Sequence, residues 1–178
     1  MGWKAIRDHY GIEHIVQVTS AGICIGSGYI HDLIVVANGV RDRSHDNDRF
    51  SVRRKKGDEL GRIMDEMDAD PAKLAELAAC ADTFDRSLTV YTYDGGAILE
   101  KQCEELGWPN VTHDGLIQYE NTFSPDRDLV RQWAIKSAKA GVEWRREAVA
   151  EAEKKLADVM SSLAQRESDL RQLLDDPA

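Results

Sequence analysis

The sequence predicts an α+β protein in which a small N-terminal antiparallel sheet with short helices precedes a long C-terminal helix that forms a coiled coil. Short β-rich runs separated by glycine and asparagine turns fill the first part of the chain, and amphipathic helical stretches follow them. After residue 125 a long stretch repeats apolar residues every seven positions. We therefore expect a globular domain over 1–124 and a long helix over 125–178, with the coiled coil starting at about residue 135.

Apolar and β-branched runs predict the strands of the sheet. Asn38 and Gly39 follow one such run and suit a type I′ turn, because both central residues of that turn need positive φ. The polar segment 41–48 is expected to be an exposed loop. The predicted strands cover 12–19, 23–25, 33–37 and 50–54.

The acidic middle of the chain predicts two short helices followed by mixed structure. Leu60, Ile63, Met64 and Met67 fall on one helical face, and Asp70 with Pro71 forms the start of a second helix. After these helices we expect a strand over 88–93, a helix over 97–106 that ends before Gly107, and a hairpin over 111–119 beside the strand of 88–93.

The C-terminal stretch is the strongest signal in the sequence. Ser124 and Pro125 are expected to cap and begin a helix of about 50 residues, which contains a single glycine, Gly141. Its apolar positions recur every seven residues, although Arg145 and Arg166 interrupt the companion positions three residues later. The predicted interface consists of Ile135, Val142, Val149, Leu156, Val159, Leu163, Leu170 and Leu173.

The length of this helix predicts a homodimer. Fifty helical residues span roughly 75 Å, whereas a globule of the preceding residues has a diameter near 35 Å. About half of the helix therefore extends beyond its own globule, and we expect pairing with a second chain to cover its leucine stripe. The alternative is that Gly141 ends one helix and a second helix folds back on it within the same chain.

Composition limits the classes of function. The 178 residues carry 23 basic and 32 acidic side chains, and a net charge of -9 argues against a general nucleic-acid binder. Residues 57–124 alone hold 4 basic and 15 acidic side chains, which are either a face for a basic partner or an aid to solubility. Three dispersed cysteines and the lack of a long apolar run predict a cytoplasmic protein without a membrane partner.

The residues that carry chemistry do not form a recognisable catalytic, cofactor or metal site, so we expect a protein that is not an enzyme and binds no cofactor. The alternative of a small enzyme would place a site near His31 and Asp32 or near His113 and Asp114. A second alternative is nucleic-acid binding through the basic stretch 49–56, which contains Arg49, Arg53, Arg54, Lys55 and Lys56. The same stretch would also contact an acidic partner.

Three segments resemble short proteins of unassigned function that bacteriophages and prophages carry. These segments are GICIGSGYIHDLIVV at 22–36, DPAKLAELAA at 70–79 and EELGWPNVTHDG at 104–115. The resemblance implies a phage-type accessory or inhibitor protein that binds and blocks a host or defence protein, in the cytoplasm of a bacterial host. It implies no functional residue. Together with the seven-residue repeat, it predicts a non-enzymatic protein-binding module that dimerises through its C-terminal helix.

Overall fold

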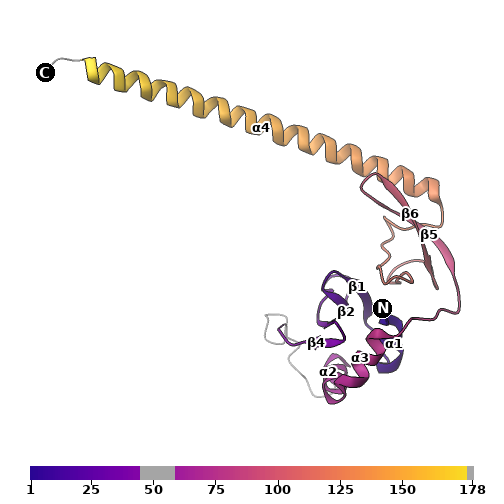
Figure 1. The fold of residues 1–178 in the computed structure, drawn as a ribbon. Helices are drawn as coiled ribbons and strands as arrows, with labels where there is room; N and C mark the ends of the chain where they lie inside the picture. The colour runs from indigo at the N-terminus through magenta and orange to yellow at the C-terminus, as the bar shows by residue number, and fades with distance from the viewer. Residues whose placement is uncertain (45–58, 176–178) are drawn as a thin grey trace. The chain divides into compact units, whose positions relative to one another are not determined.

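The computed structural model describes residues 1–44 and 59–175 (Figure 1). The fold is α+β, as predicted, with a four-stranded antiparallel sheet, short helices and a long C-terminal helix. The chain divides into two compact units, Met1–Trp133 and Ala134–Ala178.

The four-stranded sheet is an antiparallel meander in which each strand pairs with the next along the chain. Asn38 and Gly39 have φ of 52° and 78°, which confirms the predicted type I′ turn. The strand that this turn leads into begins at Val40, so the start of the segment predicted as a loop is in fact paired. The strand predicted over 50–54 lies outside the described residues. The four strands are β1 (Ile15–Thr19), β2 (Gly22–Gly26), β3 (Ile34–Ala37) and β4 (Val40–Asp42).

Three helices pack with this sheet: α1 (Trp3–Tyr10), α2 (Glu59–Ala69) and α3 (Pro71–Ala79). The last two were predicted, and the Asp70 carboxylate accepts a hydrogen bond from the backbone amide of Lys73 as an N-cap. α1 was not predicted, although its residues 3, 6 and 10 line one face and Gly11 ends it in the left-handed conformation. The core of the unit consists mainly of Trp3, Ile6, Ile23, Ile25, Ile34, Val36, Ile63, Met67 and Leu74.

A two-stranded sheet of β5 (Leu88–Asp94) and β6 (Ala97–Cys103) follows. The helix predicted over 97–106 is wrong, because Gly95 and Gly96 form a two-residue turn that aligns seven residues of β6 with β5. Thr112 bridges to Cys103 of β6, and Val111 bridges to Ile117. The predicted hairpin over 111–119 therefore borders β6 and not the strand of 88–93, which pairs with Ser124 instead.

Contacts far apart in sequence join the two sheets of the first unit. The Trp3 indole donates to the carbonyl of His113 at 3.0 Å, and the Lys4 ammonium lies 2.7 Å from the Glu104 carboxylate. The Val18 amide donates to the carbonyl of Gly115 at 2.8 Å. These contacts fix residues 84–115 against α1 and β1.

The long helix α4 (Arg127–Asp175) begins two residues later than predicted. Ser124 accepts from the amide of Asp126, whose carboxylate in turn accepts from the amides of Asp128 and Leu129 and so caps the helix. The helix passes through Gly141 without a break, so the fold-back alternative is wrong. Within the described residues, no helix is both long and apolar enough to cross a membrane.

Candidate oligomerisation interface

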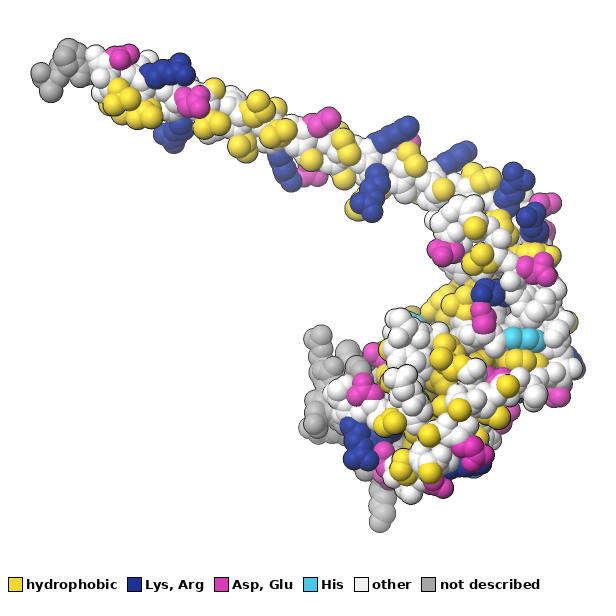
Figure 2. All heavy atoms as spheres, viewed as in Figure 1, with side chains coloured by type: hydrophobic (Ala, Val, Ile, Leu, Met, Phe, Trp, Pro, Cys, Tyr) yellow, Lys and Arg dark blue, Asp and Glu magenta, His cyan; other side chains and the backbone are white. Residues whose placement is uncertain are grey.

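All eight predicted interface residues lie on α4 with their side chains exposed. Their exposed fractions run from 47% at Ile135 to 75% at Leu173. Six of them repeat every seven residues from 135 to 170, so they follow one face of the helix. Figure 2 shows hydrophobic side chains along the whole length of the helix.

This exposure contrasts with the first unit, where large aliphatic side chains are buried. Ile6, Ile25 and Ile63 have no exposed surface. Single exposed apolar side chains are normal on a protein surface, but a continuous stripe of them marks an interaction site. The apolar stripe of α4, defined as the eight predicted residues together with Met160 and Leu174, is the candidate surface of this kind.

Met160 and Leu174 were missed in the sequence analysis. Their exposed fractions are 61% and 75%, and each directly follows a predicted interface residue. The signal was available, because each lies four residues after a member of the seven-residue repeat, Leu156 or Leu170, and therefore on the same side of the helix.

An open groove with a volume of about 650 Å³ lies on the same face of the helix. Its floor is made of small and β-branched residues, and charged side chains line its sides. A helix surface with small residues lets another helix approach closely. The groove is lined by Ala138, Gly141, Val142, Arg145, Arg146, Val149, Ala150 and Glu153.

Ion pairs within α4 hold charged side chains beside the apolar stripe. Arg146 lies 2.9 Å from Glu143, and Lys155 lies 2.7 Å from Glu151. Each such pair stabilises an exposed helix by about 0.3 to 0.5 kcal/mol. The positions opposite the stripe are mostly polar, and they include Glu147, Lys154, Ser161 and Ser168.

His113 and Asp114 serve structural roles. The His113 ring stacks on Phe84 with a centroid distance of 3.7 Å, and its Nε2 lies 3.0 Å from the carbonyl oxygen of Arg86. Asp114 pairs with Lys101 and accepts from the Thr112 hydroxyl. Burial raises the pKa of Asp114, but the hydrogen bonds from Lys101 and Thr112 outweigh it and hold the pKa below its ordinary value. Both side chains are therefore held by contacts within the first unit.

The second candidate pair, His31 and Asp32, is not joined by a hydrogen bond or ion pair in the part of the chain that the structure describes. The Nδ1 atom of His31 is buried without a partner there, whereas Asp32 is exposed. The structure therefore does not bring these two side chains together as an acid–base pair.

The buried cysteines Cys24 and Cys103 are not activated as nucleophiles. Burial raises the pKa of the Cys24 and Cys103 thiols, which is the reverse of what an attacking thiolate needs. Cys80 is exposed. In residues 1–44 and 59–175 no three His, Cys, Asp or Glu side chains are grouped to hold a metal ion. The basic residues Arg49, Arg53, Arg54, Lys55 and Lys56 lie outside the described residues.

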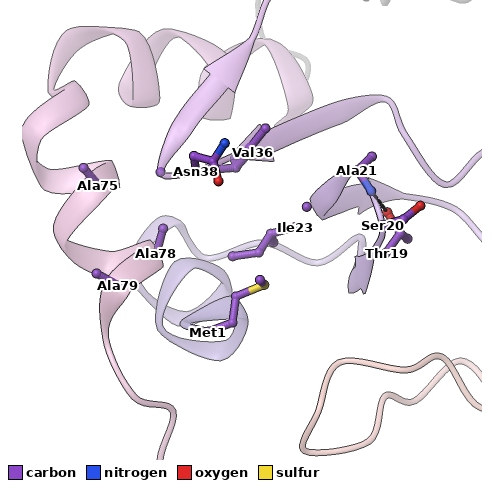
Figure 3. Close-up of a pocket in the computed structure, with 13 residues that line it drawn as sticks. Met1, Thr19, Ser20, Ala21, Ile23, Val36, Asn38, Ala75, Ala78 and Ala79 are labelled. Carbon is purple, nitrogen blue, oxygen red and sulfur yellow. Dashed lines mark hydrogen bonds between the residues drawn. The ribbon is translucent and has the colours of Figure 1, made fainter.

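A cavity of about 410 Å³ opens in the first unit between the strand ends and α3 (Figure 3). Ala75, Ala78 and Ala79 of α3 form one wall, and the turns at 19–22 and 37–39 form the other. The side chains that line it include no acid or base, and the Thr19 hydroxyl already accepts from the amide of Ala21.

Among the candidate sites in the described residues, the apolar stripe is therefore the one that the structure supports best. Comparison of the chain with protein-family models, with curated proteins and with solved structures finds no match.

Proposed function

We propose that this chain is a non-enzymatic protein-binding module that pairs with a second copy through the apolar stripe of α4. The observation that carries the proposal is the stripe itself, in which ten large apolar side chains along one helix are 47% to 75% exposed. Burial of such a stripe against an identical stripe is the usual way in which a helix of this pattern is stabilised.

The dimer would present two copies of the α+β unit to a protein partner. The 15 acidic and 4 basic side chains of residues 57–124 favour a partner with a basic surface, because opposite charge speeds encounter and suppresses wrong partners. A phage-type inhibitor that blocks a host or defence protein is our proposal for this role, and it rests on the resemblance of residues 22–36, 70–79 and 104–115.

Sedimentation equilibrium tests the pairing. The wild-type chain of 19.9 kDa is expected to sediment with about twice its mass at tens of micromolar. Leu156 and Leu163 are 60% and 57% exposed, so pairing buries surface worth about 1 to 2 kcal/mol at each. Leu156→Asp with Leu163→Asp removes four such side chains per dimer, about 4 to 8 kcal/mol, and weakens the dimer by about a thousandfold or more.

The matched control is Ser161→Asp with Ser168→Asp, which adds the same charges to the opposite face of the same helix. This control is expected to remain dimeric. A wild-type chain that stays at 19.9 kDa at every concentration contradicts the proposal, and so does a control that dissociates as fully as the leucine variant.

Affinity capture from a bacterial host, with wild type and the monomeric leucine variant compared, tests the partner role. A host protein retained by wild type and weakly by the variant supports two-copy binding. Capture of no specific protein contradicts the inhibitor role while leaving the dimer unaffected.

A further inference from the structure

We infer that the two α4 helices of the proposed dimer run antiparallel, with Ile135 of one chain opposite Leu173 of the other. The midpoint of the overlap along the axis is then level with Lys154. This inference rests on the proposed pairing of the apolar stripes. It adds the direction and alignment of the second copy, which decide where the two α+β units are held.

Two columns of residues make up the seam. The first column is aliphatic throughout and consists of Ile135, Val142, Val149, Leu156, Leu163 and Leu170. The second column lies three residues later and is mixed; it consists of Ala138, Arg145, Ala152, Val159, Arg166 and Leu173. In a coiled coil, both columns face the partner helix.

A parallel pair in register would place each second-column residue against its own copy. Arg145 would then face Arg145 and Arg166 would face Arg166, inside a seam that excludes water. Two like charges in such a place repel strongly because the local dielectric is low. The parallel arrangement is therefore disfavoured at two of its six second-column positions.

The antiparallel pair avoids placing an arginine against its own copy, because every second-column residue then faces an aliphatic first-column residue. Arg166 of one chain and Arg145 of the other then lie in neighbouring layers, about 4.5 Å apart along the axis. Both arginines lie beside aliphatic side chains and can extend their guanidinium groups to water. The six layers are Ile135–Leu173, Val142–Arg166, Val149–Val159, Leu156–Ala152, Leu163–Arg145 and Leu170–Ala138, each written as the first-column residue and then its opposite on the other chain.

The groove on α4 lies within the overlap of the two helices. Its lining residues span 138–153, and the antiparallel alignment places residues 155–170 of the second copy opposite them. Leu170 then meets the small Ala138, and Leu163 meets Arg145, both of which line the groove. Large side chains against small ones fill an interface better than small against small, which the parallel pair would give where Ala138 faces Ala138.

Charges beside the seam also favour the antiparallel direction. Glu167 lies on the same flank as Lys139 and Arg146 and, in the antiparallel pair, falls between these two cations of the second copy. In a parallel pair the neighbour of Glu167 is Ser162, so no opposite charge meets it. Near the centre Lys155 on one flank and Glu153 on the other each meet their own copy, and each Lys155 is already paired with Glu151 of its own helix.

The direction of the pair determines what the dimer is able to bind. In the antiparallel alignment the two copies of Trp133, where the first unit ends, are about 63 Å apart along the axis. A parallel pair would start both helices at the same end. The antiparallel dimer is therefore suited to hold two partner surfaces that are far apart.

Spin labels measure the direction by pulsed electron resonance on the full chain. Cys80→Ala removes the exposed thiol, and Gln172→Cys introduces a labelling site on α4 away from the stripe. In the antiparallel pair the labels at residue 172 of the two chains lie about 54 Å apart, whereas a parallel pair brings them within about 25 Å. Lys154→Cys is the control, because its two labels are close in both directions.

The outcomes separate this inference from the proposed dimer. A short distance at residue 172 in a chain of dimeric mass overturns the antiparallel direction and leaves the dimer standing. A distance near 44 or 65 Å overturns the alignment, since a shift of one seven-residue repeat changes the separation by about 10 Å. Monomeric mass with no coupling at either site overturns both.

Charge reversal gives an independent test. Glu167→Lys is expected to weaken the antiparallel dimer about tenfold, because the new cation faces Lys139 and Arg146 of the second copy. Glu147→Lys, on the opposite face, is the matched control and is expected to leave the dissociation constant unchanged. Adding Lys139→Glu and Arg146→Glu to Glu167→Lys should restore the affinity. Equal effects of Glu167→Lys and the control overturn the antiparallel alignment.

Discussion

The ion pair between Arg41 and Asp68 links β4 to α2, and its loss is predicted to destabilise the first unit. The Arg41 side chain is 4% exposed and donates two hydrogen bonds to the Asp68 carboxylate, from Nε at 2.8 Å and from Nη2 at 2.7 Å. Asp68→Asn keeps the shape of the side chain but removes its charge and one of the two acceptors. The substitution therefore perturbs the contact with Arg41 and the exposed pair with Arg43, whose Nη2 lies 3.3 Å from the Asp68 carboxylate, and little else.

The expected loss is about 1 to 3 kcal/mol at neutral pH. Hydrogen bonds to charged groups contribute roughly 1.5 to 3 kcal/mol, and the Asp68 side chain is 24% exposed, so solvent weakens the pair. Urea unfolding of the full chain, monitored by near-UV circular dichroism at one fixed protein concentration, measures this difference in the free energy of unfolding. Asp8→Asn is the control, since Asp8 forms an exposed pair with Arg7 and should change stability by less than about 0.5 kcal/mol.

The effect should depend on pH with a definite sign. The hydrogen bond from Arg41 is the main cause that holds the pKa of Asp68 below its ordinary value, burial opposes it, and the charges of Arg41 and Arg43 add to it. A carboxyl whose pKa is lower in the folded state stabilises the fold above its unfolded pKa, about 3.9, and loses this contribution as the pH falls further. The gap between wild type and Asp68→Asn should therefore be full at pH 7 and shrink below about pH 4.

Two results would refute this reasoning. The first is a variant that is as stable as wild type at pH 7. The second is a gap that persists unchanged at pH 3, because the contribution would then not come from the ionised carboxylate.

Three further substitutions test the packing and the seam. Gly115→Ala should cost about 2 kcal/mol or more in urea unfolding, because Gly115 has φ of +86° and a Cβ there would lie 2.2 Å from Cγ2 of Val18; unchanged stability would contradict this contact. In the Leu156→Asp, Leu163→Asp chain, where no second copy covers the groove, Gly141→Ala should raise the melting temperature of α4 in far-UV circular dichroism, because it removes a glycine that costs about 1 kcal/mol and a Cβ there meets nothing within 4 Å; a lower melting temperature would contradict a continuous, uncovered helix at this position. Arg145→Leu with Arg166→Leu should tighten the dimer about tenfold in sedimentation, because aliphatic residues replace charges in the seam; a weaker dimer would show that the arginines lie outside it.

The parts of the fold that were predicted correctly depend on local signals. The N-cap at Asp70, the type I′ turn at Asn38 and Gly39 and the continuous repeat of α4 each involve residues within one or two turns of the chain. Local hydrogen bonds and side-chain spacing determine these features almost independently of the rest of the molecule. The same locality explains why eight of the ten residues of the apolar stripe were identified from spacing alone.

The error at β6 shows where local reasoning fails. Residues 97–103 contain Ala, Leu, Glu, Lys and Gln, which favour helix in isolation, but they pair along their whole length with the β-branched and aromatic strand β5. Pairing with β5 satisfies the backbone groups of these residues and outweighs a propensity of a few tenths of a kcal/mol per residue. The Gly95–Gly96 turn between two runs was the usable signal, because a two-residue glycine loop is typical of a hairpin.

The two His-Asp dipeptides show why the sequence alone could not distinguish the surroundings of the two candidate sites in the first unit. His31–Asp32 and His113–Asp114 are chemically identical in sequence, yet only the second is tied into the fold. Phe84 and Arg86 hold the ring of His113, while Lys101 holds Asp114. Those partners lie 13 to 29 residues away and meet the dipeptide only because β5 and β6 form a hairpin there. A surface on one helix follows from spacing, whereas the role of a dipeptide follows from the strands that pair around it.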